Sequence, residues 1–109
     1  MAYSEALAAR VRKIIATEEG VTERQMFGGL AFMLRGNMCC GVLGEDLMLR
    51  VGPERYEDAL GRAGARPMDF TGRPMTGMVY VDGKAVATGA KLRAWLEVAL
   101  EFVGELPAK

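Results

Sequence analysis

The side chains of this sequence that could carry out chemistry are two adjacent cysteines, a few carboxylates and a single serine. Cys39 and Cys40 are the only cysteines in the 109 residues, and a disulfide between sequence neighbours would close a small, strained ring. We interpret them as buried thiols, and a redox pair or a soft-metal site is the alternative. The sequence does not indicate a secreted scaffold that depends on disulfides.

Histidine is absent, which removes the most common general base and the most common zinc ligand. The sole serine, Ser4, is interpreted as a helix cap. Glu45 and Asp46 together with Asp82 could bind a hard cation or act as acid and base, but turn positions favour solvated carboxylates. Glycine-rich phosphate-binding motifs are also missing. We therefore predict that the protein is not an enzyme and has no catalytic residue, cofactor or metal.

Basic and acidic residues number 14 each, so the chain has no net positive charge of the kind that attracts nucleic acid. Arginine nevertheless outnumbers lysine, and its guanidinium group suits bidentate contact with phosphate or carboxylate. Two interpretations stay open, a solvated surface and a phosphate-binding one. The basic residues that dominate the middle of the chain are Arg24, Arg35, Arg50, Arg55, Arg62, Arg66, Arg73, Lys84, Lys91 and Arg93.

The most distinctive local motif is Met26-Phe27-Gly28-Gly29. Two glycines after an apolar pair allow the backbone to bend sharply, or allow another group to approach it closely. A tight junction between strands is the favoured interpretation. The alternative is a ligand or partner backbone that lies against the glycines.

Hydrophobic periodicity predicts how these residues are positioned. Apolar residues at helical spacing predict an amphipathic helix over 4–17, which Gly20 terminates. Alternating apolar residues over 24–51 predict a meander of four strands that begins near Arg24. In this interpretation Gly36-Asn37 and Gly44-Glu45-Asp46 form the hairpin turns. The alternation also places Met38 on the same side as Cys40 and Val42.

The second half of the chain has four further predicted elements. Gly52-Pro53-Glu54 indicates the start of a short helix that Gly64 closes. Residues 66–70 could form a strand, and Met78 to Val81 form a clearer one that ends at Asp82-Gly83. From Thr88 to Gly104, apolar residues recur at i, i+3 and i+4, which is the strongest helical pattern in the sequence.

The predicted order is α-β4-α-β2-α, an α+β fold with a mainly antiparallel sheet in a single domain, 1–109. Several strands, notably residues 30–34, are apolar on both faces. We therefore expect part of the sheet, or the helix that carries Trp95, to form a homodimer interface. The chain has no apolar run long enough to span a bilayer and no signal peptide, so we expect a cytoplasmic protein without membrane contact.

Four segments together resemble the TfoX N-terminal domain family over nearly the whole chain. They are Arg24-x-Met26-Phe27-Gly28-Gly29, Leu47-Met48-Leu49-Arg50, Gly64 to Phe70 and Met78-Val79-Tyr80. The resemblance implies an antiparallel α+β domain, similar in outline to secretion-chaperone-like folds. The family takes its name from a regulator of natural competence, in which such a domain precedes a separate C-terminal domain, and it implies no catalytic residues.

The function that we expect from the sequence is a non-catalytic regulatory or protein-interaction module with an unknown protein partner. A nucleic-acid-binding protein that uses the mid-chain arginines is the first alternative, and a small-ligand-binding protein is the second. The candidate contacts with a partner or a phosphate are Arg24, Phe27, Gly28, Gly29, Arg50 and Arg73.

Overall fold

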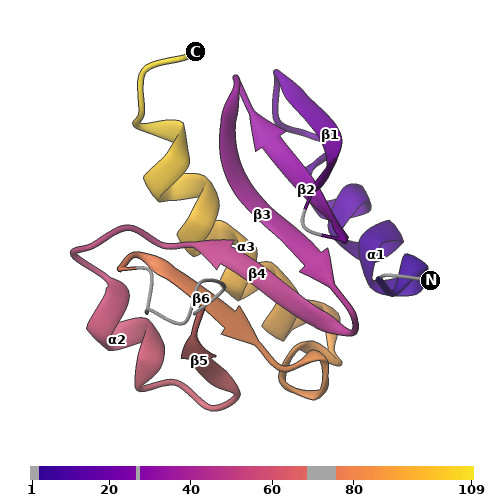
Figure 1. Ribbon diagram of the computed structural model, residues 1–109, viewed down its shortest axis with the longest axis vertical. Helices are drawn as coiled ribbons and strands as arrows, with labels where there is room; N and C mark the ends of the chain where they lie inside the picture. Colours follow the sequence, from indigo (N-terminus) through magenta and orange to yellow (C-terminus); the bar gives the residue numbers. More distant parts are fainter. Residues whose placement is uncertain (1–2, 27, 69–75) are drawn as a thin grey trace.

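The computed structural model describes residues 3–26, 28–68 and 76–109, which form an α+β fold with the element order expected from the sequence (Figure 1). Among the helices of these residues, none has the length and apolar character needed to cross a membrane. In chain order the elements are α1 (Glu5–Ile15), β1 (Val21–Met26), β2 (Gly29–Leu34), β3 (Asn37–Leu43), β4 (Asp46–Arg50), α2 (Tyr56–Leu60), β5 (Ala65–Pro67), β6 (Met78–Val81), the 3₁₀ helix η1 (Gly83–Val86) and α3 (Gly89–Gly104).

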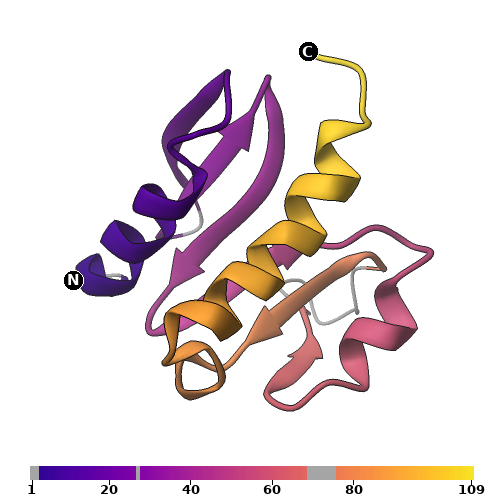
Figure 2. The same cartoon turned by 180° about the vertical axis from the view of Figure 1, so that it is seen from behind.

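The strands form one antiparallel sheet with the order β1-β2-β3-β4-β6-β5. Helices α1 and α3 lie on the same side of this sheet, as the front and rear views both show (Figure 1, Figure 2). The short helix α2 lies near β5 and β6 at one edge. We call the side that faces α1 and α3 the inner face of the sheet, and the opposite side the outer face.

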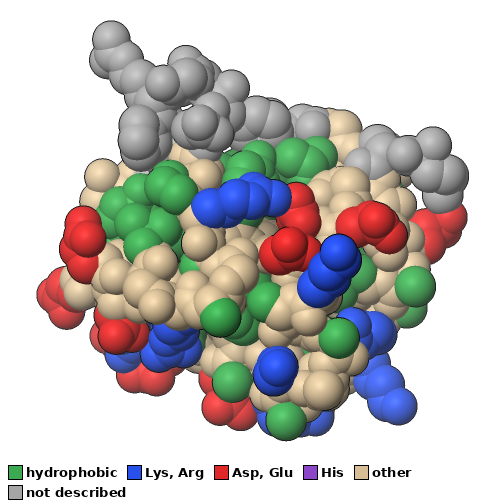
Figure 3. Space-filling model, turned by 90° about the horizontal axis from the view of Figure 1, so that it is seen from below, with side chains coloured by type: hydrophobic (Ala, Val, Ile, Leu, Met, Phe, Trp, Pro, Cys, Tyr) green, Lys and Arg blue, Asp and Glu red, His purple; other side chains and the backbone are tan. Residues whose placement is uncertain are grey.

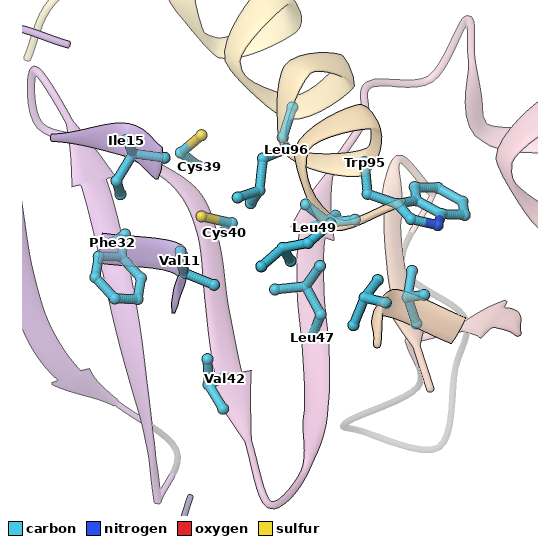
Figure 4. Packing of buried hydrophobic residues seen from close by; sticks show 14 of the residues in the cluster. Val11, Ile15, Phe32, Cys39, Cys40, Val42, Leu47, Leu49, Trp95 and Leu96 are labelled. Carbon is cyan, nitrogen blue, oxygen red and sulfur yellow. The ribbon is translucent and has the colours of Figure 1, made fainter. Parts of the chain in front are cut away.

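The main hydrophobic core lies between the inner face and the two long helices. Leu30, Phe32 and Leu34 alternate along β2 and are at most 5% exposed. They pack in one cluster with Ile15 of α1 and Leu96 of α3 (Figure 4). Burial of these large side chains is the main favourable contribution to folding, at about 1.5–3 kcal/mol for each.

Both long helices begin at side-chain caps, of which the sequence predicted the one at Ser4. The Ser4 hydroxyl accepts a hydrogen bond from the Leu7 amide at 3.1 Å, and the Thr88 hydroxyl accepts one from the Lys91 amide at 3.2 Å. Each bond satisfies an amide in the first turn that has no partner within the helix. Gly20 follows α1 with a φ of 81°, a conformation that favours glycine, and it leads directly into β1.

Helix α2 and strand β5 are shorter than the sequence predicts. The helix spans Tyr56–Leu60 and ends at Gly61, so Pro53 does not begin it and Gly64 does not close it. Gly64 instead adopts a φ of 85° immediately before β5, which is restricted to Ala65–Pro67. Residues 69–70 of the predicted strand lie outside the described residues.

The first hairpin turn is displaced by one residue from its predicted position, and the second is shorter than predicted because Asp46 already belongs to β4. Arg35 and Gly36 form the turn between β2 and β3 with φ angles of 49° and 85°, while Asn37 already belongs to β3. Two positive φ angles give this turn the twist that adjacent strands need. Asn37 is 3% exposed, and its side-chain amide donates to the Pro107 carbonyl at 2.9 Å. Glu45 follows Gly44 in the next turn.

The predicted alternation along β3 is wrong at Met38, because the strand contains a bulge. Phe32 pairs with Cys40 and Met33 pairs with Met38, so Cys39 is an extra residue opposite β2. A bulge of this kind turns two successive side chains toward the same side of a sheet. Both cysteines therefore join the core, and Met38 packs with the outer-face cluster.

Strand β1 also begins earlier than predicted, at Val21. Its residues Thr22 to Gln25 are all exposed, since β1 is an edge strand that contacts only β2 within the sheet. An exposed polar strand has no apolar alternation, so hydrophobicity could not locate its first residues.

Candidate functional site

The outer face of the sheet is rich in methionine. Met48 and Met78 form a buried cluster with Met68, which follows β5, and Met38, Leu43 and Tyr80 pack against it. By strand register, Met26 and Met33 leave β1 and β2 on the same face. Six of the eight methionines of the chain therefore gather there, namely Met26, Met33, Met38, Met48, Met68 and Met78. Sequence reasoning noticed the two-sided apolar strands but did not identify this group.

The methionines of the outer face differ in their exposure. Met48, Met68 and Met78 are 0%, 1% and 8% exposed. Met33 and Met38, on β2 and β3, are only half-buried, and so is the neighbouring Leu43. The half of the outer face formed by β1, β2 and β3 therefore presents apolar side chains to solvent.

Glycines in the sheet allow these side chains to lie flat. A Cβ atom on Gly41 would come within 2.7 Å of the Met48 methyl group, so the end of Met48 occupies the space above this glycine. Leu43 lies in the same way next to Gly29, where a Cβ atom would be 3.2 Å from its methyl group. Side chains from neighbouring positions therefore occupy the space beside both glycines of the outer face.

Two arginines on the outer face have no carboxylate partner among the described residues. Arg24 is exposed on β1 and shares a register row with Ala31 and Gly41. Arg50 leaves β4 on the outer face, and its guanidinium group lies 5.7 Å from the centre of the ring of Phe102, a residue of α3 that packs against the main core. Arg50 also donates to the Met38 carbonyl at 3.5 Å, which is a weak hydrogen bond.

Arg50 lines a small hollow of about 100 Å³ with Gly52, Gly77, Met78 and Phe102 among its walls. Stacking on Phe102 holds a guanidinium group by a cation–π contact while leaving its N–H groups free to donate. The arrangement can therefore accept an anionic group in this hollow, between Phe102 of α3 and Met78 of the outer face. A carboxylate and a phosphate both fit this chemistry.

The other arginines are dispersed over the molecule and mostly neutralised. The described ion pairs are Arg12 with Glu23, Arg55 with Glu101, Arg62 with Asp58 and Arg66 with Asp46. Hydrogen bonding to Arg12 lowers the pKa of the Glu23 carboxyl group. Arg35 donates instead to backbone carbonyls. The mid-chain arginines that the structure describes do not converge on one concave surface.

Acidic and basic side chains also lie interspersed at the lower end of the molecule (Figure 3). Glu45, Asp46 and Asp82 line a groove of about 510 Å³ together with Arg10 and Lys84. Asp46 is paired with Arg66, and Asp82 caps η1 by accepting from the Lys84 amide at 3.0 Å. Among the described residues, no group of three metal-ligating side chains is assembled. Glu45 lies in the turn as predicted, whereas Asp46 is the first residue of β4, so its assignment to the turn is wrong.

Cys39 and Cys40 are free thiols in the core, at 2% and 0% exposure. The bulge turns both of them toward the helices, where Figure 4 shows them beside Ile15 and Leu96. A hydrogen bond with Cys39 and complete burial raise the pKa of the Cys40 thiol well above its usual range. A protonated, inaccessible thiol is a poor nucleophile and a poor metal ligand.

The residues named from the sequence as candidate contacts are only partly brought together. Arg24, Gly29 and Arg50 belong to the outer face, while Gly28 lies at the turn between β1 and β2 with a φ of 77°. That angle, and the 2.4 Å that would separate a Cβ on Gly29 from the Val42 carbonyl, agree with a tight strand junction. Phe27 and Arg73 lie outside the described residues.

Comparison with protein families finds that the TfoX N-terminal domain model matches residues 13–103. The matched segment runs from within α1 to the end of α3 and contains the whole sheet. The chain therefore belongs to the TfoX N-terminal domain family. Comparisons with curated proteins and with solved structures found no match.

Proposed function

We propose that this member of the TfoX N-terminal domain family is a non-catalytic regulatory module that acts by binding another protein through the outer face of its sheet. The observation that carries the proposal is the methionine-rich outer face. No helix of the described residues covers it, and its β1 to β3 half presents Met33, Met38 and Leu43 in half-buried positions. Exposed apolar surface of this kind is typical of interaction sites.

The chemistry of methionine supports this use of the outer face. Its unbranched side chain and polarizable sulfur adapt to the shape of a partner, and methionine is used repeatedly on binding surfaces for that reason. The inner face, in contrast, is packed with leucine, phenylalanine and valine. A sheet with one face committed to the core and the other lined by adaptable side chains suits a docking domain.

Alternative functions have less support. Nucleic-acid binding through the arginines would require them to act together, whereas four of the described arginines are engaged in ion pairs. Catalysis would require activated groups, and the sequence lacks histidine while its thiols are buried. The groove beside Arg10 is lined by acids that already have structural partners.

Homodimerization stays a prediction. The helix that carries Trp95 has its apolar side in the core of its own chain. The outer face is therefore the remaining candidate surface for a homodimer interface. Two copies stacked about a two-fold axis would each present Arg24 and Arg50 on that face. Like charges would then lie in one interface, which favours a different partner over a second copy.

The test is capture of binding proteins from an extract of the native host with three forms of the protein. Met33→Glu places a charge on the outer face, while Arg93→Glu, on the exposed side of α3, is the matched control. We expect a protein that the wild type and Arg93→Glu retain and that Met33→Glu loses, with circular dichroism confirming that all three fold. Equal retention by all three would exclude the outer face, and recovery of no other protein would contradict the proposed function.

A further inference from the structure

We infer that the partner surface recognised by the outer face is an amphipathic helix that carries carboxylates at the two ends of its apolar stripe. This inference rests on the proposed function and specifies the chemistry of the partner. It follows from three properties of the outer face: its shape, its charge and the spacing of Arg24 and Arg50.

The shape favours a helix over an extended strand. Along β2 and β3 the small residues Gly29, Ala31 and Gly41 occupy outer-face positions between the larger apolar side chains, where a helix could approach the sheet. A helix is about 10 Å wide, which is about two strand spacings. An extended segment would instead add to the edge of β1, where the exposed side chains are polar and charged.

The charge of the outer face selects an acidic partner. On strands β1 to β4, the outer-face positions contain one carboxylate, Asp46, and it is already bound to Arg66. Arg24 and Arg50 have no described carboxylate within ion-pair distance. A carboxylate from a partner would gain charge-assisted hydrogen bonds with either guanidinium group.

The spacing of the two arginines fixes the spacing of the acids. Three interstrand spacings of about 4.8 Å lie between β1 and β4. Arg50 is two residues, about 6.8 Å, beyond Met48, which shares the row of Arg24. The two Cα atoms are therefore about 16 Å apart. A helix rises about 1.5 Å per residue, so its carboxylates would be about eleven residues, or three turns, apart.

The line between the two arginines crosses the half-buried methionines. Met33 and Met38 pair directly across β2 and β3 and lie between β1 and β4. Apolar residues of the partner at i+3, i+4 and i+7, counted from the first acid, would face them. Apolar contact would then supply affinity, while the two ion pairs would set the orientation.

The test uses synthetic helical peptides of about 18 residues with a leucine stripe, labelled for fluorescence anisotropy. One peptide carries Glu at two positions eleven residues apart beside the stripe, a second carries Lys there, and a third carries Glu on the opposite side of the helix. We expect the first peptide to bind the wild type at least about tenfold more tightly than the other two, and more weakly as salt increases.

Variants of the protein complete the test. Arg24→Glu should weaken the first peptide about tenfold and improve the Lys peptide, while Arg93→Glu should change neither. Arg50 also contacts Phe102, so Arg50→Gln accompanies Arg50→Glu, and thermal unfolding of both verifies the fold. Equal affinity for all three peptides would overturn the inference, and so would indifference to changes at both arginines.

Two outcomes separate this inference from the proposed function. A host protein that binds the wild type and is lost with Met33→Glu, together with no binding of the acidic peptide, would refute the helix while the docking function stands. Light scattering that shows a dimer abolished by Met33→Glu would assign the outer face to a second copy. That result would overturn the acidic helix as its occupant.

Discussion

The two faces of the sheet use the same strands but different kinds of apolar side chain. On the inner face, Leu30, Phe32 and Leu34 are packed against two long helices. On the outer face, Met48, Met68 and Met78 form a smaller buried cluster, and Met33 lies half-buried on the same face, which no described helix covers. Branched and aromatic side chains have few rotamers and specify one packing arrangement, whereas methionine adapts to several.

The difference separates folding from binding within one sheet. Contacts on the inner face link segments that are distant in the sequence, because α1 and α3 come from opposite ends of the chain. Those on the outer face mostly connect neighbouring strands. We therefore expect substitutions on the inner face to change the free energy of unfolding most, and substitutions on the exposed half of the outer face to change binding.

The largest expected effect compares adjacent residues of β2. Phe32→Ala removes a ring that is 0% exposed and should lower the free energy of unfolding by about 3–5 kcal/mol. Met33→Ala truncates a half-buried side chain on the other face and should cost about 1 kcal/mol or less. Urea denaturation followed by circular dichroism measures both. Similar losses for the two variants would contradict the division between the faces.

A smaller effect is expected at Gly41, where an added side chain would meet both the neighbouring strand and an outer-face methionine. A Cβ atom there would lie 2.7 Å from the Leu30 carbonyl oxygen and 2.7 Å from the Met48 methyl group. The methionine can move, but the strand carbonyl cannot without disturbing the sheet. Gly41→Ala should therefore cost about 1–3 kcal/mol in the free energy of unfolding.

Gly89→Ala is the control for that substitution. Gly89 is the first residue of α3, and a Cβ atom there would meet nothing within 4 Å. Alanine should leave the unfolding free energy unchanged or raise it by up to about 1 kcal/mol. A tolerated Gly41→Ala, with the same denaturation midpoint as the wild type, would mean that β2 and β3 can separate locally.

Much of the fold could be predicted from the sequence because its signals are local. Helix α3 follows its apolar periodicity from the Thr88 cap to Gly104, and β2 and β6 follow their alternation. The pairing of β2 with β3 could not be predicted in this way, because it depends on one extra residue in β3. The bulge at Cys39 reverses the side on which Met38 lies, and no hydrophobic pattern reveals it.

The candidate site was less predictable than the fold, because it depends on register between strands. The sequence indicated that residues 30–34 are apolar on both faces, and it named Arg24 and Arg50. It could not show that the two arginines share the outer face with six methionines, since that requires the pairing of four strands. Dispersal of the other arginines likewise depends on which carboxylates lie beside them.

The smallest expected effect concerns the pH dependence of stability on the inner face. Cys40 is fully buried, and its thiol has a pKa raised by its hydrogen bond with Cys39 and by burial. The unfolded chain releases this proton near pH 8.5. The folded chain retains it to higher pH, so above about pH 8.5 the folded state binds more protons and its stability falls as pH rises.

Below that pH the Cys40 thiol is protonated in both the folded and the unfolded chain. Its contribution to the free energy of unfolding should therefore not change with pH. Cys40→Ala removes the titration while every outer-face group is retained. Urea midpoints measured from pH 7 to about pH 10 should therefore fall more steeply in the wild type than in the variant, even though the variant begins lower because of the cavity it creates. If the urea midpoints of the two proteins fall in parallel with pH, the Cys40 thiol ionises as easily in the folded chain as in the unfolded one. Water would then reach the inner face at the bulge.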